Sequence, residues 1–215
     1  MDNPSRTAAI ILAAGTSSRM GSERNKLLLP LHHRPVLAHV IEAVLGSRAR
    51  PIVLVLGHEA EEIKIHLQQD LSENPIQVVE NSAYALGQST SMQAGLHTLL
   101  ALTPADHLNS VIFLLGDQPM ITSHMINELI ELKEQSGKRI VLPLYQGQRG
   151  NPVIFSLDLA PELLQVNGDE GGRSVLKRHP NDIATLEMGE EAANFDVDTW
   201  EAYLQVLAAW EEKML

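Results

Sequence analysis

The chain has 215 residues, of which 44% are apolar and 20% charged, so it is long enough for a well-buried core and too apolar for intrinsic disorder. Its 16 Lys and Arg residues and 27 Asp and Glu residues give a formal net charge of −11, which argues against a long nucleic acid held through its phosphates. Cysteine is absent, which excludes disulfides, a thiol nucleophile and cysteine-based metal sites.

The first predicted element is a buried strand, AAIILAA at 8–14, which stops at Gly15. This apolar run is too short to span a membrane and lacks a signal-peptide cleavage region, so we expect a cytoplasmic protein with no membrane partner. Gly15 is expected to let the backbone turn tightly, and Thr16, Ser17 and Ser18 offer amide and hydroxyl donors of the kind that cradle phosphate. Residue composition here thus predicts an anion-binding loop.

The basic residues behind this loop are Arg19, Arg24 and Lys26. The loop is not a Walker A motif, because no Gly-Lys-Ser/Thr follows, and not a dinucleotide fingerprint, because Ser17 stands where a second glycine would be. Spacing alone is equally compatible with a polar turn that carries solvated basic side chains.

Further β-like apolar runs alternate with amphipathic helical stretches along the chain. The predicted strands are 51–57, 75–81, 110–116, 139–145 and 151–155. The predicted helices are 35–46, 59–69, 88–102, 123–136, 172–179 and 199–213. This alternation predicts an α/β fold: a single Rossmann-like three-layer domain over residues 1–215, with a mostly parallel central sheet covered by helices on both faces.

The residue composition changes after about residue 145, where YQGQRGNP and NGDEGGR bring glycine and polar residues together. We interpret this part as an elaboration of the same domain that covers the sheet's active edge. The chain then divides into a half over 1–120, which contains the first loop, and a half over 121–215.

Three polar segments follow predicted strands: GTSSRMG, GHEAEE and GDQP. Open α/β sheets bind ligands at the carboxyl ends of their strands, so these segments are expected to meet at one edge. Asp117 of GDQP is costly at the end of an apolar strand without a partner, and a divalent cation is a natural one. A turn-capping aspartate is the alternative. Asp196 and Asp198 are spaced to point the same way in an extended segment, or to cap a helix that begins near Thr199.

Two more groups admit both a structural and a functional interpretation. Gly87, Gln88 and Ser89 precede a predicted helix, and spacing alone favours ordinary capping. Downstream, polar turns with amides that can meet an anion contain seven candidate residues: Arg149, Gly150, Asn151, Asp169, Gly171, Gly172 and Arg173.

These segments together resemble a known family. LAAGTSSRMG...KLLLP is similar to the signature of nucleotidyltransferases that load a nucleoside monophosphate onto a phosphorylated acceptor. The details resemble the molybdenum cofactor cytidylyltransferases, also called molybdenum hydroxylase accessory proteins. The resemblance continues, in the family's order, through GHEAEEI, GQSTSMQAG, GDQPM, QRGNPVIF, GDEGGR and FDVDTWEAY.

The resemblance assigns a role to each group. It implies that Arg19, Lys26 and Asp117 are catalytic, and that Asp117 and Asp198 hold Mg²⁺, with Asp196 in reserve. The nucleotide would be bound by Leu12, Ala13, Ala14, Gly15, Thr16, Ser17, Ser18, Gly57, Gly87, Gln88 and Ser89. The acceptor would be bound by Arg149, Gly150, Asn151, Asp169, Gly171, Gly172 and Arg173.

The activity implied is transfer of a cytidylyl group from CTP to the terminal phosphate of molybdenum-bound molybdopterin, with release of pyrophosphate. Ala14 resembles the pyrimidine-using members, since guanylyl-transferring relatives typically read LAGG. The SERN insertion before KLLLP departs from the family and leaves open whether Arg24 or Lys26 meets the phosphates; the register of KLLLP favours Lys26. A molybdenum hydroxylase is the implied client. Transfer to a sugar phosphate or another small phosphate, and non-catalytic carriage of the finished cofactor, are the alternatives.

Overall fold

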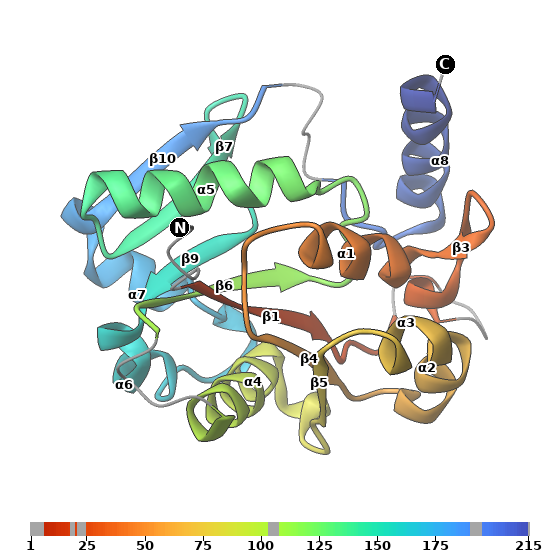
Figure 1. The fold of residues 1–215 in the computed structure, drawn as a ribbon, viewed down its shortest axis with the longest axis horizontal. Helices are drawn as coiled ribbons and strands as arrows, with labels where there is room; N and C mark the ends of the chain where they lie inside the picture. The colour runs from red at the N-terminus through yellow and green to blue at the C-terminus, as the bar shows by residue number, and fades with distance from the viewer. Residues whose placement is uncertain (1–6, 18–19, 21–24, 103–107, 190–194, 215) are drawn as a thin grey trace.

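A mostly parallel sheet organises the computed structural model, which describes residues 7–17, 20, 25–102, 108–189 and 195–214. The sheet has eight strands in these residues, in the order β10-β7-β9-β6-β1-β4-β5, with β8 paired to β7 (Figure 1). Its strands are β1 (Thr7–Ala13), β4 (Ile52–Leu56), β5 (Ile76–Glu80), β6 (Ser110–Leu115), β7 (Ile140–Tyr145), β8 (Gln148–Arg149), β9 (Val153–Ser156) and β10 (Ile183–Glu187). Strands β8 and β9 run antiparallel to their neighbours, and the others are parallel.

The centre of the sheet is apolar on both sides because helices cover both. All residues of β1 and β4 are buried, as expected for strands between two helical layers. At the start of β1, the hydroxyl groups of Thr7 and Ser110 lie 2.8 Å apart, so two buried polar side chains satisfy each other. Parallel registers of β4 and β6 on β1 bring the carboxyl ends of all three strands to one edge.

One face of the sheet packs against α1 (Val36–Leu45), α2 (Ala60–His66) and α5 (Ser123–Ser136). The other face packs against α4 (Gln88–Leu102), α6 (Ala160–Leu163) and α7 (Arg173–Arg178). On this second face α4 lies very close to the sheet, since a Cβ added to Gly95 would be 2.6 Å from Cγ2 of Ile10. Helix, sheet and helix form the three predicted layers.

The C-terminal helix, α8 (Trp200–Met214), lies apart from the sheet beside α1 (Figure 1). It packs on a small separate cluster whose buried members are Leu29, Leu31, Val36, Met120, Val197, Tyr203 and Val206. The Trp210 ring of α8 lies 4.4 Å, between centroids, from the His39 ring of α1. This packing holds the preceding segment, which contains Asp196 and Asp198, against the body of the domain.

The predicted fold class is confirmed, and each predicted strand and helix corresponds to an element of the structure. The predicted helix at 59–69 is broken at Leu67, so that α3 (Gln68–Ser72) follows α2 as a separate helix. Sequence patterning missed β10, because this edge strand is only partly buried and lacks a continuous apolar run. It also missed the short hairpin of β2 (Pro30–Leu31) and β3 (Arg34–Pro35). Within the described ranges, no helix is long and apolar enough to cross a membrane.

Candidate functional site

The loops after β1, β4 and β6 pack against one another at the carboxyl edge of the sheet. A Cβ added to Gly57 would lie 2.7 Å from the Ala14 Cβ, and one added to Gly116 would lie 3.1 Å from the Ala13 Cβ. The first distance is too short for a side chain and the second is tighter than most Cβ contacts, so glycine at both positions lets these three loops converge. Gly15 differs, because a Cβ there would meet nothing within 4 Å. Among the described residues, none therefore fills the space beside the Gly15 Cα.

The first loop has its left-handed residue at Ser17. Ser17 has a φ of 53°, whereas Gly15 is not among the residues with positive φ. The Ser17 hydroxyl accepts a hydrogen bond of 3.1 Å from the Lys26 backbone N–H. Leu12, Ala13 and Ala14 are buried, whereas Gly15 and Thr16 are exposed. The described phosphate-facing candidates are therefore Gly15, Thr16 and Ser17.

Three of the predicted residues of this region, Ser18, Arg19 and Arg24, lie outside the described residues. Lys26 is described and begins a short 3-10 helix, Lys26–Leu28, whose first turn is capped by the Asn25 side chain. The cap fixes the direction in which the Lys26 side chain leaves the backbone.

Lys26 joins two carboxylates that are far apart in the sequence. Its ammonium donates to Asp117 Oδ2 and, at 2.6 Å, to Asp198 Oδ1. The side chains are 12%, 14% and 24% exposed for Lys26, Asp117 and Asp198, so all three are largely withdrawn from water. Burial by itself would lower the pKa of Lys26, but the charges and hydrogen bonds of the two carboxylates outweigh it and hold that pKa above its usual value. Lys26 is therefore protonated near neutral pH.

Asp196 lies beside this cluster with a different partner. Gln118 Nε2 donates to Asp196 Oδ1 at 2.5 Å. Burial, followed by repulsion from Asp117, raises the pKa of Asp196 to about 6. The alternative that the aspartate pair caps α8 is not what the structure shows, because the Thr199 hydroxyl accepts from the Ala202 N–H at 3.1 Å instead.

The raised pKa of Asp196 predicts a pH-dependent gain in stability for Asp196→Asn. The folded-state pKa lies above the ordinary value near 4, so wild-type stability falls as pH rises through the window from about 4 to about 6. Asparagine does not titrate and keeps an oxygen for Gln118. We expect the variant's unfolding free energy, relative to wild type, to increase by up to about 3 kcal/mol between pH 4 and pH 8. Urea unfolding with EDTA at both pH values measures it, and a difference that does not change with pH contradicts the prediction.

The described residues offer two carboxylates for a cation rather than a complete cage. No group of three or more His, Cys, Asp or Glu side chains in the described ranges could hold a metal ion. Two carboxylates from different elements, Asp117 and Asp198, nevertheless already share one cation, the Lys26 ammonium. Mg²⁺ is typically held by one or two carboxylates, with water and substrate phosphates as its other ligands. The donor set therefore fits a divalent cation that arrives with a phosphorylated substrate.

The predicted base-recognition residues lie at the start of α4. Gly87 has φ of 112°, and Gln88, the first residue of the helix, is exposed. Ser89 is only 2% exposed, so it faces the protein interior. Behind it, the buried Asn81 side chain donates to the Thr90 and Ser91 hydroxyls at 2.8 and 3.0 Å. Sequence reasoning missed Asn81, although its position directly after β5 was a usable signal.

The predicted acceptor residues occupy two places. Arg149, Gly150 and Asn151 lie in or directly after β8, which pairs with the end of β7. The Tyr145 hydroxyl donates to the Asn151 carbonyl at 2.8 Å. Burial, with a further contribution from the charge of Asp196, raises the Tyr145 pKa to about 12.

The second place is the turn Gly168–Glu170 and the start of α7. Here Asp169 Oδ1 accepts a 3.2 Å hydrogen bond from the Gln88 N–H. Gly172 fits tightly, since a Cβ there would be 2.7 Å from the Phe155 ring. The structure thus brings the two glycine-containing loops together, although 80 residues separate them.

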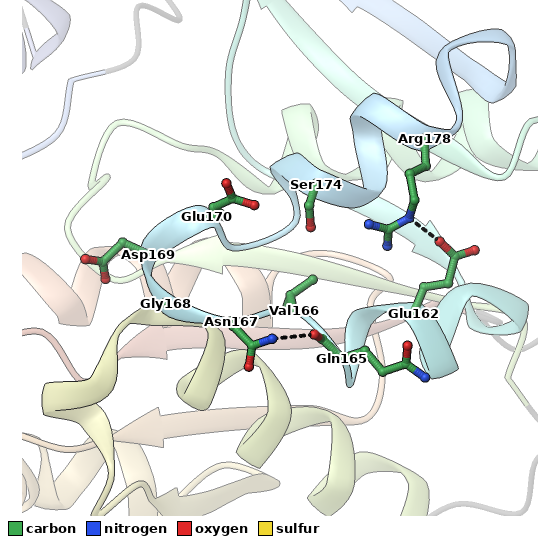
Figure 2. A pocket seen from close by; sticks show the side chains of 9 residues that line it. All are labelled: Glu162, Gln165, Val166, Asn167, Gly168, Asp169, Glu170, Ser174 and Arg178. Carbon is green, nitrogen blue, oxygen red and sulfur yellow. Dashed lines mark hydrogen bonds and ion pairs between the residues drawn. The ribbon is translucent and has the colours of Figure 1, made fainter.

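A surface cavity of about 780 Å³ is lined in part by this turn (Figure 2). Its lining residues are Glu162, Gln165, Val166, Asn167, Gly168, Asp169, Glu170, Ser174 and Arg178. Arg178 is engaged by Glu162 at 2.8 Å, and the other charged lining residues are acidic. The cavity shares no residue with the cluster of Lys26, Asp117 and Asp198. Because its charged lining is mainly acidic, it does not suit a triphosphate.

Comparison with known proteins identifies the sequence family. The model of the MobA-like NTP transferase domain matches residues 9–183, so Asp117 lies inside the matched region and Asp198 outside it. Nicotine blue oxidoreductase of Paenarthrobacter nicotinovorans is 27% identical over 207 residues, 92% of this chain and 95% of that protein. The bifunctional protein GlmU of Acinetobacter baumannii is 34% identical over 131 residues, 61% of this chain. This match spans about a quarter of the length of GlmU, 26%.

Solved structures share the fold over nearly the whole chain. The homologue of Mycobacterium tuberculosis Rv0371c from Mycobacterium sp. strain JC1 has a TM-score of 0.82 and 25% identity, covering 98% of this chain and 100% of the other. Rv0371c in complex with manganese has a TM-score of 0.73 and 24% identity, covering 94% and 98%. The 4-diphosphocytidyl-2C-methyl-D-erythritol synthase of Anaerococcus prevotii has a TM-score of 0.72 and 18% identity, covering 95% and 96%.

Proposed function

Because the chain belongs to the family of MobA-like NTP transferase domains, we propose that it transfers a cytidylyl group from CTP to the terminal phosphate of molybdenum-bound molybdopterin and releases pyrophosphate. The observation that carries this proposal is the meeting of Lys26, Asp117 and Asp198 at the sheet edge, where the Lys26 N–H also donates to the Ser17 hydroxyl of the first loop. The fold shared with a solved diphosphocytidyl-compound synthase supports cytidylyl transfer as a reaction of this architecture.

The proposed reaction asks the protein mainly for alignment and charge neutralisation. A phosphate monoester is already largely anionic near pH 7, so it can attack the α-phosphate of CTP without a general base. Its oxygen forms the new bond to the α-phosphorus as the bond to the β-phosphate oxygen breaks, and pyrophosphate leaves with that electron pair. Transfer at phosphorus then depends on in-line positioning and on stabilising the leaving charge.

Several residues divide these tasks. The amides of Gly15, Thr16 and Ser17 bind the triphosphate, and Lys26, together with Arg19 from outside the described residues, neutralises the departing pyrophosphate. Asp117 and Asp198 would hold Mg²⁺, which supplies further neutralisation of phosphate charge when bound. A manganese complex of the structural neighbour Rv0371c supports a divalent cation in this fold. Gln88 is the residue proposed to contact the base edge, because Ser89 is buried.

Ala14 is proposed to act on base choice through the shape of the loop. It is 4% exposed, and its methyl group lies where a Cβ on Gly57 would clash. A glycine at this position would free the loop backbone to adopt other conformations. The preference for CTP over GTP rests on the resemblance of LAAG to the pyrimidine-using members, and the burial of Ala14 means that its effect would be exerted through the loop backbone.

A screen of nucleotides against acceptors tests the proposal directly. Purified protein with Mg²⁺ is offered CTP, GTP, UTP or ATP, each with molybdenum-bound molybdopterin or with a sugar phosphate, and pyrophosphate is measured. We expect release only with the molybdenum cofactor, and faster with CTP than with GTP by on the order of 10-fold or more. Equal rates with both nucleotides would contradict the assignment of CTP. Turnover with a sugar phosphate would show that the acceptor is a sugar phosphate rather than the molybdenum cofactor.

The same screen separates two other functions. Stoichiometric binding of the finished cofactor with no pyrophosphate release would make the protein a carrier that delivers it to a molybdenum hydroxylase. The name of the Paenarthrobacter relative points to a redox activity. Here the first loop lacks the second glycine of the dinucleotide fingerprint, because Ser17 occupies that position. NADH or NADPH consumption with an organic dye tests this alternative, and we expect none.

A further inference from the structure

Helix α4 begins without a capping side chain of its own. The residue before it is Gly87, whose φ of 112° suits glycine and which has no side chain to cap the helix, although its carbonyl accepts from the Thr90 N–H at 3.2 Å. The carboxylate that accepts from the Gln88 N–H comes from Asp169, 81 residues later in the chain, at 3.2 Å. A carboxylate is also the favoured charge at a helix N-terminus. The cap of α4 is therefore supplied by the predicted acceptor turn.

The two loops touch through their backbones as well. A Cβ added to Gly87 would lie 2.5 Å from the Gly168 carbonyl carbon and 2.9 Å from Asp169 Oδ1. A Cβ added to Gly171 would lie 2.8 Å from Gln88 Oε1, so the Gln88 side chain rests against the same turn. Neither loop can shift at this contact without displacing the other.

A second connection lies one turn further along α4. The Gln93 side-chain amide donates to the carbonyl oxygens of Leu164 and Val166, at 3.1 and 2.8 Å. These carbonyls belong to the segment that leads into Gly168–Glu170. Hydrogen bonds to α4 thus come both from the turn itself, at Asp169, and from the segment that precedes it. Figure 2 shows Asp169 and Arg178, the last residue of α7, on opposite sides of the pocket, and the partner of Arg178 is Glu162 rather than α4.

We propose that Asp169 is a positioning residue: it caps α4, holds Gln88 in place for the base, and so links nucleotide binding to the acceptor turn. This inference rests on the proposed function, in which Gln88 meets the base. It gives Asp169 a role that is exerted on the nucleotide before any acceptor is present. Because the two loops share one interface, ordering it for one ligand lowers the ordering cost for the other. CTP and the acceptor should therefore strengthen each other's binding.

Nucleotide binding without acceptor tests the role of Asp169. The dissociation constant of CTP with Mg²⁺ is measured by calorimetry for wild type, Asp169→Ala, Asp169→Asn and the control Glu170→Gln, which removes an exposed charge from the same turn. Loss of a helix cap is worth about a factor of 5 to 10. We expect Asp169→Ala to weaken CTP binding by that factor, and Asp169→Asn, which keeps an acceptor oxygen, to stay within about twofold of wild type. Glu170→Gln should also bind CTP like wild type.

A double variant shows whether Asp169 acts through Gln88. If it does, adding Asp169→Ala to Gln88→Ala should weaken CTP binding little further, because the positioned side chain is already gone. Fully additive effects overturn the inference. So does an unchanged CTP dissociation constant in Asp169→Ala with a weaker apparent affinity for the acceptor, which would make Asp169 a direct acceptor contact. If wild type binds no nucleotide, the proposed function fails and the inference falls with it; if wild type binds CTP and Asp169→Ala binds it equally, the inference alone fails.

Discussion

Replacement of Asp117 by Asn should lower the rate of pyrophosphate release by on the order of 10²-fold or more, while the protein remains folded. Asparagine preserves the size of the side chain and the backbone contact in which the Asp117 carbonyl accepts from the Val197 N–H at 2.9 Å. It removes the negative charge that faces Lys26 and that is proposed to hold Mg²⁺. The loss should appear in kcat at saturating CTP and acceptor, because charge stabilisation is needed most in the transition state.

The matched control is Asp158→Asn. Asp158 follows β9, which runs antiparallel to β6 and therefore ends at the opposite edge of the sheet from Asp117. Its side chain is 58% exposed, and its Oδ2 lies 3.7 Å from Nη1 of Arg139. Near-wild-type turnover is expected for this variant. Wild-type turnover of Asp117→Asn, with thermal unfolding unchanged in both proteins, would remove Asp117 from the mechanism.

Replacement of Lys26 by Met should affect both stability and activity. The ammonium of Lys26 is the shared partner of Asp117 and Asp198, and its removal leaves two largely buried carboxylates facing each other, with Asp196 nearby. Removing one member of a buried ion pair leaves uncompensated charge, so we expect a loss of about 2–4 kcal/mol in the free energy of unfolding at pH 8. Turnover should fall by on the order of 10²-fold or more, because the proposed neutralisation of pyrophosphate is lost.

Two further measurements identify the cause in Lys26→Met. Lowering the pH to 5 should recover part of the stability, because the neighbouring Asp196, whose pKa is raised to about 6, becomes neutral and no longer repels the other two carboxylates. The dissociation constant for Mn²⁺, measured by electron paramagnetic resonance without nucleotide, should fall several-fold, since the ammonium no longer competes for the same carboxylates.

The control for Lys26→Met is Lys64→Met. Lys64 also bridges two carboxylates, those of Glu61 and Glu80, but at the surface. Exposed ion pairs contribute little to stability, so its unfolding midpoint should change little. A similar loss of stability in both variants, or unchanged Mn²⁺ binding in Lys26→Met, would contradict the expected role of the buried cluster.

Much of the fold could be predicted because its signals are local. Runs such as SVIFLL are apolar on both sides of the strand, which only a sheet covered on both faces can bury. Amphipathic stretches between them predicted helices such as α5, whose start the Thr122 side chain caps as its residue type favours. The edge strand β10 and the break at Leu67 were missed, because partial burial and tertiary contacts outweigh pattern there.

For the candidate site, the sequence could propose which residues belong to it but not how their side chains pair. Residue type and position after a strand indicated Asp117, and resemblance added Asp198 and Lys26. Nothing in the local sequence shows that Lys26 lies between the two carboxylates, or that Asp196 bonds Gln118 instead of joining them. The spacing of Asp196 and Asp198 predicted side chains with a common direction, but the segment is irregular and gives them different partners.

By itself, the sequence determined the class of fold, the sheet edge at which the three polar loops meet and the kinds of side chain available there, because hydrophobic period, glycine positions and strand direction are properties of short segments. Tertiary structure decided the pairings: the turn at Ser17, the sharing of Lys26 by Asp117 and Asp198, and the capping of α4 by Asp169. Apart from the turn at Ser17, these contacts join residues that lie from 81 to 172 positions apart in the sequence. Which distant side chains meet depends on how whole elements pack, and no local pattern carries that information.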